Sequence, residues 1–332
     1  MLRRTLLLSS LAPALAALAC SRRRLGSERI TLRVATSPYL ISSPFYVSYE
    51  AGYFKDAGFD VELMKEMPSL QSIPLLAAGK QDVGFVGMSA GLLNAVARGA
   101  RVRIVAAREI ASPSCKQTGV VYVRTSEFPN GIRDMRQLRR HRISVTPSTT
   151  ATVMFGLDKL LEHAGMSRSD VEIKAMNFNE EVAALRGGSV DAMVVSSIDM
   201  APMLQALQIA PGPGLADVLP GFQCAFIVFG ARLLDADVRS GALFLRAYLR
   251  GLREFQAGKT PAFMDEYARS RGLDQKLVRA GCRDAYERDG RIHLNDIQAF
   301  MDWAASHGSI PHPMSAQSVV DTRFLDALPG LS

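Results

Sequence analysis

The sequence has few cysteine and histidine residues, and none of them is spaced for metal binding. Its 332 residues include four cysteines, no two in a Cys-x-x-Cys pair, and five histidines without His-x-x-x-His or His-Glu-x-x-His spacing. It also has no Gly-x-Ser-x-Gly nucleophile turn and no phosphate-binding loop. We therefore expect no metal, no cofactor and no catalytic residues, and the chain is predicted not to be an enzyme.

Three cysteines lie far apart beyond the N-terminal segment, at positions 115, 224 and 282. Cys115 and Cys224 could form a disulfide in an oxidising compartment, but their spacing does not establish the pair. The alternative is that all three are small hydrophobic side chains.

The N-terminus lacks a hydrophobic run long enough to span a membrane. After the basic start "MLRR", the fifteen residues "TLLLSSLAPALAALA" carry no charge, whereas a span needs about twenty apolar residues. Residues 1–19 are predicted to be an export signal and residues 20–29 a solvated tether. Ala17-Leu18-Ala19 fits either simple cleavage or a lipoprotein signal that lipidates Cys20, and Arg3-Arg4 leaves Sec and twin-arginine export open. We expect a location in the periplasm or on the outer face of the cytoplasmic membrane.

The folded part of the chain lacks a charge excess. The formal net charge is +7, but five arginines precede the first acidic residue, Glu28. The remainder has 34 basic and 32 acidic residues, so it lacks the excess positive charge that is typical of nucleic-acid-binding proteins.

What the sequence does contain is an internal repeat. "LLAAGKQDVGFVGMS" at residues 75–89 recurs as "AALRGGSVDAMVVSS" at residues 183–197, and a shift of 109 positions aligns Gly79 with Gly188 and Asp82 with Asp191. The glycine of each copy is expected to end a helix, and the aspartate to begin a strand. We therefore expect structural roles for both aspartates and no catalytic carboxylate pair.

The repeat predicts two α/β lobes. Strands are expected at residues 31–35, 60–64 and 83–86 in the first copy, and at 142–145, 172–175 and 192–195 in the second. Strands that alternate with helices indicate parallel βαβ units. The apolar runs at 119–125 and 222–230 are interpreted as the crossovers between lobes. Lobe 1 would comprise residues 30–118 and 230–332, and lobe 2 residues 119–229 including the crossovers.

The C-terminal third is predicted to be helical and to pack on the first lobe. Phe244, Ala247, Tyr248, Gly251, Leu252 and Phe255 fall on one helical face. Asn295 is expected to cap a second helix that carries Ile297, Phe300, Met301 and Ala304.

Ligands of open α/β sheets bind at the carboxyl ends of the strands, so two such lobes would surround one cleft with the turns that follow their strands. The residues that we expect to contact the ligand are Ser37, Ser43, Phe45, Met67, Met88 and Ser89 from the first lobe and Ser148, Thr149, Thr150, Asn177, Ser196, Ser197 and Asp199 from the second.

Two of these predictions, and one further candidate, Arg108, have alternatives that involve no ligand. Ser148, Thr149 and Thr150 precede a helix, whose free N–H groups favour an anionic oxygen, although a plain N-cap needs only one hydroxyl. Phe45 could cover a flat ligand or lie in the core. Arg108, after the apolar run at 102–107, could pair with an anion, although an arginine in such a position is more often solvated.

Several phrases together resemble one family: "EAGYFKDAGFDVEL", "SIPLLAAGKQDVGFVGMS", "LLNAVARGARVRIVA", "DMRQLRRHRISVTPSTTATVMFGLDKLLEHAGMSRSDVEI" and "AALRGGSVDAMVV". The chain resembles the extracytoplasmic solute-binding proteins of ABC transporters in the nitrate, sulfonate, taurine and thiamine-precursor group. The resemblance covers roughly residues 30–325. It implies a type II periplasmic-binding-protein fold with a two-strand hinge, closure around a small molecule, and delivery to a membrane permease and its ATPase.

Departures from the family pattern narrow the range of expected ligands. "TSPYLISSPFY" has no Trp, Asn or His, unlike the pyrimidine-precursor binders, and "SSIDMAP" stands where many relatives have Trp followed by an acid and Pro. A small organic anion, a sulfonate or a carboxylate, is therefore expected. The alternatives are a thiamine-pyrimidine synthase or a pyrimidine binder, and a ligand-sensing lipoprotein without a permease. The cysteine-rich motif of the synthases has no counterpart here.

Overall fold

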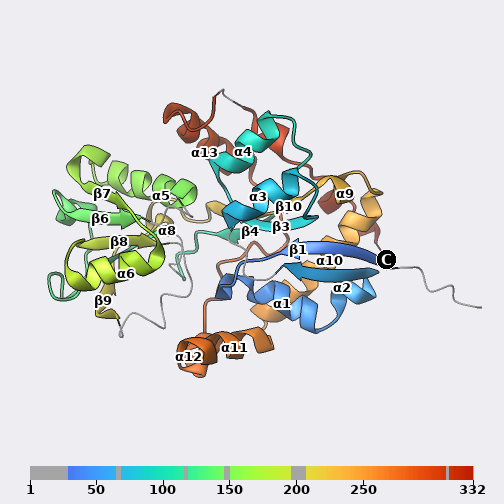
Figure 1. Cartoon of the computed structure of the whole chain (residues 1–332), viewed down its shortest axis with the longest axis horizontal. Coiled ribbons are helices and arrows are strands. Elements are labelled where there is room, and N and C mark those ends of the chain that lie inside the picture. The colour runs from blue at the N-terminus through green and yellow to red at the C-terminus, as the bar shows by residue number, and fades with distance from the viewer. Residues whose placement is uncertain are drawn as a thin grey trace, which may run out of the picture.

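The chain folds into two lobes, each built around one β-sheet (Figure 1). The computed structural model describes residues 29–64, 69–115, 119–145, 150–195, 207–311 and 314–331. Each lobe contains a five-stranded sheet, and the strand orders are β2-β1-β3-β10-β4 and β7-β6-β8-β5-β9. The predicted two-lobed α/β fold is confirmed.

In the first sheet, β1, β2 and β3 are parallel, and β10 runs antiparallel to its neighbours β3 and β4. The strands are β1 (Ile30–Ala35), β2 (Phe59–Met64), β3 (Val83–Gly87), β4 (Arg103–Ile110) and β10 (Gln223–Phe229). The first three lie within one residue of the predicted boundaries at each end.

The second sheet repeats this arrangement: β6, β7 and β8 are parallel, and β5 runs antiparallel to β8. The strands are β5 (Val120–Arg124), β6 (Arg142–Val145), β7 (Glu172–Ala175), β8 (Ala192–Val195) and β9 (Ile209–Pro211). The strands β6, β7 and β8 begin and end at the predicted residues.

One ion pair joins the first and third strands of the repeat in both lobes. Arg33 on β1 donates from its main-chain N and from Nε to Asp82, at 2.8 and 3.1 Å. Arg142 on β6 makes the same two bonds to Asp191, both at 3.0 Å. In each lobe Nη2 of the arginine also donates to the glycine carbonyl three residues before the aspartate, at 2.7 and 2.9 Å. Because the partners of the two copies are 109 residues apart, the sequence repeat encodes the same clamp twice, and both aspartates have structural roles.

The glycine of each copy ends a helix, as the repeat predicts. Gly79 and Gly188 have φ angles of 66° and 73°, in the left-handed region where a side chain would be strained. Gly188 is the C-cap of α6 (Phe178–Gly187), and its N–H donates to the last turn of that helix.

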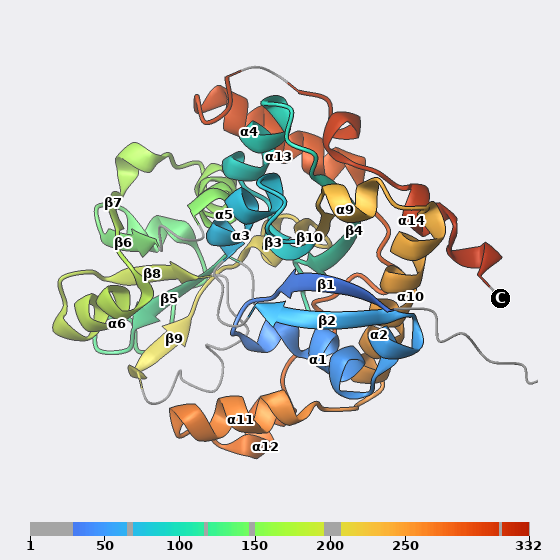
Figure 2. The same ribbon diagram turned by 45° about the vertical axis from the view of Figure 1, so that its right-hand side comes forward.

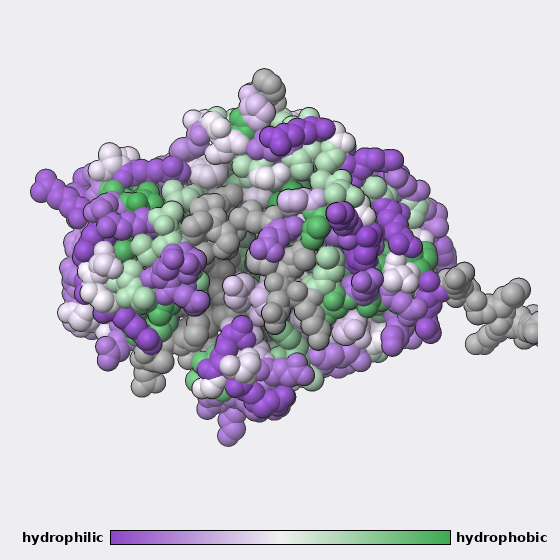
Figure 3. All heavy atoms as spheres, viewed as in Figure 1, coloured by the Kyte–Doolittle hydropathy of each residue, from purple (hydrophilic) through white to green (hydrophobic). Residues whose placement is uncertain are grey.

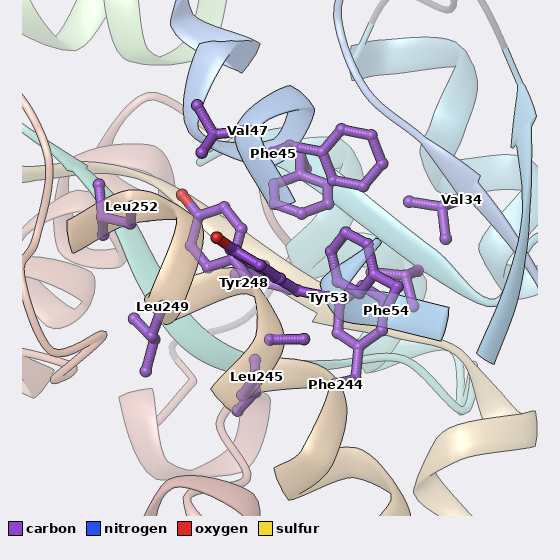
Figure 4. Packing of buried hydrophobic residues seen from close by; sticks show 14 of the residues in the cluster. Val34, Phe45, Val47, Tyr53, Phe54, Phe244, Leu245, Tyr248, Leu249 and Leu252 are labelled. Atoms are coloured by element: carbon purple, nitrogen blue, oxygen red, sulfur yellow. The ribbon is translucent and has the colours of Figure 1, made fainter. Parts of the chain in front are cut away.

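Two helices dominate the core on one face of the first sheet. α1 (Ser43–Glu50) packs against α10 (Val238–Gln256), and Phe45, Phe54, Phe244 and Tyr248 lie together in one buried cluster (Figure 4). All six residues of the predicted apolar face of α10 are buried. The prediction that the C-terminal region packs on the first lobe is confirmed.

The α1–α10 contact depends on a glycine, because the two helices touch through their main chains at Gly251. A Cβ there would lie 2.7 Å from the Ser48 main-chain N and 3.0 Å from the Pro44 carbonyl oxygen. The Ser48 hydroxyl donates to the Ala247 carbonyl at 3.0 Å across the same contact.

We expect Gly251→Ala to lower the free energy of unfolding by about 1–3 kcal/mol, because a methyl group must push α1 away from α10. Urea denaturation measures the change. Gly187→Ala is the control, because nothing lies within 4 Å of a Cβ at that helical position. Equal stability of the two variants would contradict a close main-chain contact at Gly251.

The remaining helices lie around the two sheets, except that α11 and α12 lie apart from both sheets, with α11 against α1 (Figure 2). They are α2 (Tyr53–Asp56), α3 (Ser69–Ala77), α4 (Ala90–Ala97), α5 (Thr150–His163), α8 (Leu215–Val218), α9 (Ala231–Leu234), α11 (Ala262–Arg271), α12 (Gln275–Arg279), α13 (Leu294–Ser306) and α14 (Arg323–Asp326). Short 3-10 helices lie at Leu40–Ser42, Met135–Leu138, Arg168–Asp170, Ala316–Val319 and Leu328–Gly330. The N-cap position of α13 is His293, so the predicted cap at Asn295 is wrong, although the four predicted apolar residues of this helix are buried.

Both predicted crossovers contribute a strand to a sheet, since β5 lies between β8 and β9 in the second sheet. β10 lies between β3 and β4 in the first sheet, and all seven of its residues are buried. The chain therefore returns to the first sheet between β9 and β10, before residue 223.

The cysteine pairing differs from the pair that we considered. Cys115 forms a disulfide with Cys282, with Cα atoms 5.7 Å apart, and Cys224 is a buried thiol on β10. Cys224 faces the core of the first lobe. Cys282 follows α12, and the packing of this C-terminal segment brings it next to Cys115.

Hydrophilic residues cover much of the outer surface of both lobes in the view of Figure 3. Within the part of the chain that the structure describes, no helix is both long and apolar enough to cross a membrane.

Candidate functional site

The two lobes meet at the carboxyl ends of the first lobe's strands. β1, β3 and β4 all end at this edge, because β10 is antiparallel to both β3 and β4. The hydroxyl of Thr152, in the first turn of α5, donates to the Met88 carbonyl just after β3, at 2.8 Å. Since α5 belongs to the second lobe, this bond closes one part of the boundary between the lobes.

A second contact between the lobes joins α5 to α13. Phe155 of α5 stacks on Phe222 at 4.9 Å and meets the Trp303 ring edge-on at 5.7 Å. Trp303 also donates from Nε1 to the Asp158 carboxylate at 2.7 Å, and Arg168 holds the same carboxylate with two bonds of 2.7 Å. This buried contact orients the second lobe and the first turn of α5 relative to the first sheet.

The polar residues that follow β1 are engaged in the turn itself. Ser43 is fully buried and donates to the Leu40 carbonyl at 2.6 Å. The Ser37 hydroxyl lies 3.0 Å from that of Ser42, which donates to the Ser37 carbonyl at 2.7 Å. These bonds make the turn between β1 and α1 rigid.

The predicted residues after β3 and β7 begin helices. Ser89 is the N-cap of α4 and accepts from the Leu92 N–H at 3.3 Å, beside the buried Met88. Asn177 caps α6 and shares a reciprocal capping box with Glu180. Hydroxyl and amide side chains after strands therefore satisfy the first N–H groups of helices here.

Phe45 lies in the core, which was one of the two alternatives. It is 1% exposed and packs against Phe54 and Phe85 at 5.4 and 5.3 Å. Figure 4 shows it within the cluster of α1 and α10.

Several predicted site residues lie outside the described residues, namely Met67, Ser148, Thr149, Ser196, Ser197, Asp199 and the predicted lipidation site Cys20. Thr150 is the first residue of α5, as expected for a segment that leads into a helix. The ligand contacts proposed for these positions remain predictions.

Arg108, on β4, is a stronger candidate than the sequence indicated. It lies two residues before the carboxyl end of the strand and is 5% exposed, so the solvated alternative is wrong. Its Nη2 pairs with the Glu109 carboxylate, whereas Nε and Nη1 are buried without a hydrogen-bond partner among the described residues. Burial raises the pKa of the Glu109 carboxyl, and the charge of Arg108 opposes that rise.

Tyr248 of α10 packs against the same aromatic ring as Arg108. Its ring lies 5.3 Å from the Phe85 ring, and the Arg108 guanidinium lies 5.9 Å from the same ring. The tyrosine is 1% exposed, and its hydroxyl has no hydrogen-bond partner among the described residues. Burial raises the pKa of Tyr248, and the positive charge of Arg108 opposes that rise. Sequence reasoning placed Tyr248 only on the apolar face of its helix, and no local signal distinguished its hydroxyl.

Neither a metal site nor a surface depression offers a better candidate for ligand binding. Among the described residues, no three His, Cys, Asp or Glu side chains come together as a metal site. A depression of about 770 Å³ lies on the second lobe and is lined by residues such as Asn130, His163 and Pro211. None of its lining residues was predicted to contact a ligand, and we assign it no role.

A comparison with known families identifies the chain. Residues 41–219 match the NMT1/THI5-like family. The chain belongs to the NMT1/THI5-like family. The match spans the segment from α1 to α8, and so includes Arg108, Thr152 and the α5 contact, but not Tyr248.

One relative of this NMT1/THI5-like protein is an enzyme. The chain is 26% identical over 285 residues to the 4-amino-5-hydroxymethyl-2-methylpyrimidine phosphate synthase of Aspergillus parasiticus, which covers 81% of this chain and 77% of the synthase. This similarity overturns the prediction, made from missing motifs, that the chain is not an enzyme. The absence of metal and nucleophile motifs does not exclude catalysis on this fold.

Solved structures share the fold at low identity. The alkanesulfonate-binding protein SsuA from Xanthomonas axonopodis pv. citri, bound to MOPS, superposes with a TM-score of 0.69 and 16% identity over 89% of this chain and 99% of that protein. The DszB C27S mutant in complex with biphenyl-2-sulfinic acid has a TM-score of 0.66 and 16% identity over 92% of this chain and all of that protein. The fold is therefore that of the periplasmic binding proteins.

Proposed function

We propose that the protein binds a small organic anion, a sulfonate or a carboxylate, between its two lobes and serves as the extracytoplasmic solute-binding component of an ABC importer. The observation that carries the proposal is the boundary between the lobes, where the carboxyl ends of β3 and β4 meet the first turn of α5. Ligands of open α/β sheets bind at such an edge. Two structural relatives, an alkanesulfonate-binding protein with MOPS and DszB with a sulfinic acid, hold organosulfur acids on the same fold.

The mechanism is a hinge movement that the ligand biases. A ligand that contacts both lobes stabilises the closed state by its greater affinity for that state. The Thr152–Met88 bond and the α5–α13 contact are two interactions between the lobes that closure can make or adjust. The closed form is then the one that a membrane permease and its ATPase recognise.

The proposed location is the periplasm or the outer face of the cytoplasmic membrane. The Cys115–Cys282 disulfide supports this location, because disulfides persist in oxidising compartments. The export signal, the lipid on Cys20 and the lobe boundaries remain proposals from the sequence.

A second candidate function is formation of a pyrimidine phosphate, which the similarity to the Aspergillus parasiticus synthase favours. Mass spectrometry of small molecules released from the purified, denatured protein tests it. Recovery of 4-amino-5-hydroxymethyl-2-methylpyrimidine phosphate would favour the synthase.

A thermal-shift screen of the mature protein tests the binding proposal. Sulfonates, carboxylates, nitrate and pyrimidines form the panel. A ligand at 100 times its Kd is expected to add about 2.7 kcal/mol to the free energy of unfolding, because it binds only the folded state. If no sulfonate or carboxylate raises the melting temperature, the proposal is wrong.

A further inference from the structure

We propose that Arg108 and Tyr248 together bind the negatively charged group of the ligand and select an oxyanion over a neutral molecule. This inference rests on the proposed function, because it names the residues that recognise the anion in the cleft. Both residues come from the first lobe, on β4 and α10, and both pack against Phe85 of β3.

The position of Arg108 fits such a role. Arg108 lies opposite the last residues of β3 through β10, since Ala107 pairs with Phe226 and Phe226 pairs with Val86. It therefore sits at the edge where Met88 accepts the bond from the second lobe. β4 ends two residues later at Ile110, and the next strand, β5 of the second lobe, begins at Val120, so Arg108 lies near the segment that connects the lobes.

The hydrogen bonds of Arg108 indicate that an acceptor is missing. A guanidinium carries five N–H donors, and Glu109 engages only Nη2. Nε and Nη1 are both shielded from solvent and have no acceptor among the described residues. Burying such donors without a partner is costly, so a structure that retains them favours an acceptor of opposite charge.

Tyr248 adds a neutral donor beside this charge. Its hydroxyl is buried without a partner among the described residues, and it points away from Phe54 and Phe244 of the core cluster (Figure 4). Because burial raises the pKa of Tyr248, the hydroxyl keeps its proton at neutral pH and can donate it. One positive group and one hydroxyl suit the oxygens of a sulfonate or a carboxylate, which accept several hydrogen bonds at once.

The core aromatic residues limit the size of the anion. Phe85 is 3% exposed and lies between Arg108, Tyr248 and Phe45. The charged group can therefore approach the two donors only at the margin of a packed apolar cluster, where a small aliphatic tail is tolerated and a second charge is not.

Two sets of variants test the inference. Tyr248→Phe removes only the unpartnered hydroxyl, and Arg108→Gln is combined with Glu109→Gln so that no unpaired carboxylate stays buried. Glu109→Gln alone is the background, and Arg103→Gln is the matched control, because Arg103 lies at the opposite end of β4 and donates to the Ala100 and Val102 carbonyls. Calorimetric titration uses ethanesulfonate and acetate as anions and ethyl methyl sulfone as a neutral probe.

We expect the Arg108→Gln/Glu109→Gln variant to bind the anions at least tenfold more weakly than Glu109→Gln, and Tyr248→Phe to bind them about three- to tenfold more weakly than the natural protein. Affinity for the neutral sulfone should stay within twofold in every variant. Tyr248→Phe without ligand should melt at the same or a higher temperature, because it removes a buried group that lacks a partner.

The outcomes separate this inference from the proposed function. If the natural protein binds an anion and both variants bind it equally well, Arg108 and Tyr248 are not its binding site, whereas the proposed function stands. If the natural protein binds none of the anions, both the inference and the proposed function fail. A lower melting temperature of unliganded Tyr248→Phe would assign the hydroxyl a structural role and contradict its place in the site.

Discussion

Replacing Asp191 with asparagine is expected to lower the free energy of unfolding by about 3 kcal/mol. The carboxylate is 6% exposed and accepts hydrogen bonds from two arginines, from Arg142 through three N–H groups and from Arg124 through Nη2 at 2.8 Å. Without its charge, the Arg142 guanidinium loses its counter-ion at the junction of β5, β6 and β8, and Arg124 keeps only its ion pair with Glu127. Urea denaturation, followed by circular dichroism, measures the loss.

The pH dependence gives a second readout of the same group. Burial alone would raise the pKa of Asp191, but hydrogen bonds from Arg142 and Arg124 outweigh it and lower the pKa from 3.8 to about 2. A carboxyl whose pKa falls on folding stabilises the protein above about pH 5 and loses this contribution as the pH falls through 2. The difference corresponds to about 2 kcal/mol, and Asp191→Asn should lack this part of the acid sensitivity.

Glu172→Gln is the matched control for Asp191→Asn. Glu172 lies on the neighbouring strand β7 and pairs with Lys174 at 3.2 Å, but its side chain is 60% exposed. Exposed pairs contribute little, so the control should change stability by less than about 1 kcal/mol. If both variants unfold at the same urea concentration as the natural protein, the arginine clamp does not stabilise the second lobe.

Loss of the Cys115–Cys282 disulfide is expected to lower the free energy of unfolding by about 2–5 kcal/mol. The bond joins residues 167 positions apart, so it removes much conformational freedom from the unfolded chain. It also fastens the segment after β4 to the segment before α13. The hydrogen bonds between Ile110 and Ala285 (3.0 Å) and between Ser114 and Asp284 (3.1 Å) lie beside it.

Measuring stability with and without a reductant separates the contribution of this disulfide from that of Cys224. The double variant Cys115→Ser/Cys282→Ser should be less stable than the oxidised protein and insensitive to dithiothreitol. Cys224→Ala, which removes the buried thiol of the third cysteine, should keep the full sensitivity to reductant. A natural protein whose melting temperature does not change on reduction would show that the bond contributes nothing to stability.

The elements predicted most accurately from the sequence are those marked by a local residue pattern or by the internal repeat. The three strands of the second copy have the predicted ends, and those of the first copy deviate by no more than one residue, because short apolar runs between glycines and polar turns mark both boundaries. The apolar face of α10 was predicted from helical periodicity and is buried.

The candidate site was harder to predict, because serine and asparagine side chains can form hydrogen bonds either with a ligand or with main-chain groups of a turn or helix end. Ser43, Ser89 and Asn177 follow strands, as ligand-binding residues do, yet the structure shows them closing a turn or capping a helix. Arg108 had the solvated position as its more frequent alternative, and no local signal indicated that the side chain is buried.

Thus the sequence alone established two α/β halves, the position of most strands and the paired aspartates, because periodicity, turn residues and a 109-residue repeat are properties of short segments. The tertiary structure decided which distant segments meet. It placed β10 inside the first sheet, joined Cys115 to Cys282, paired each aspartate with an arginine and brought Tyr248 to Arg108. These contacts arise from long-range packing, in which separation along the chain gives no indication of proximity in space.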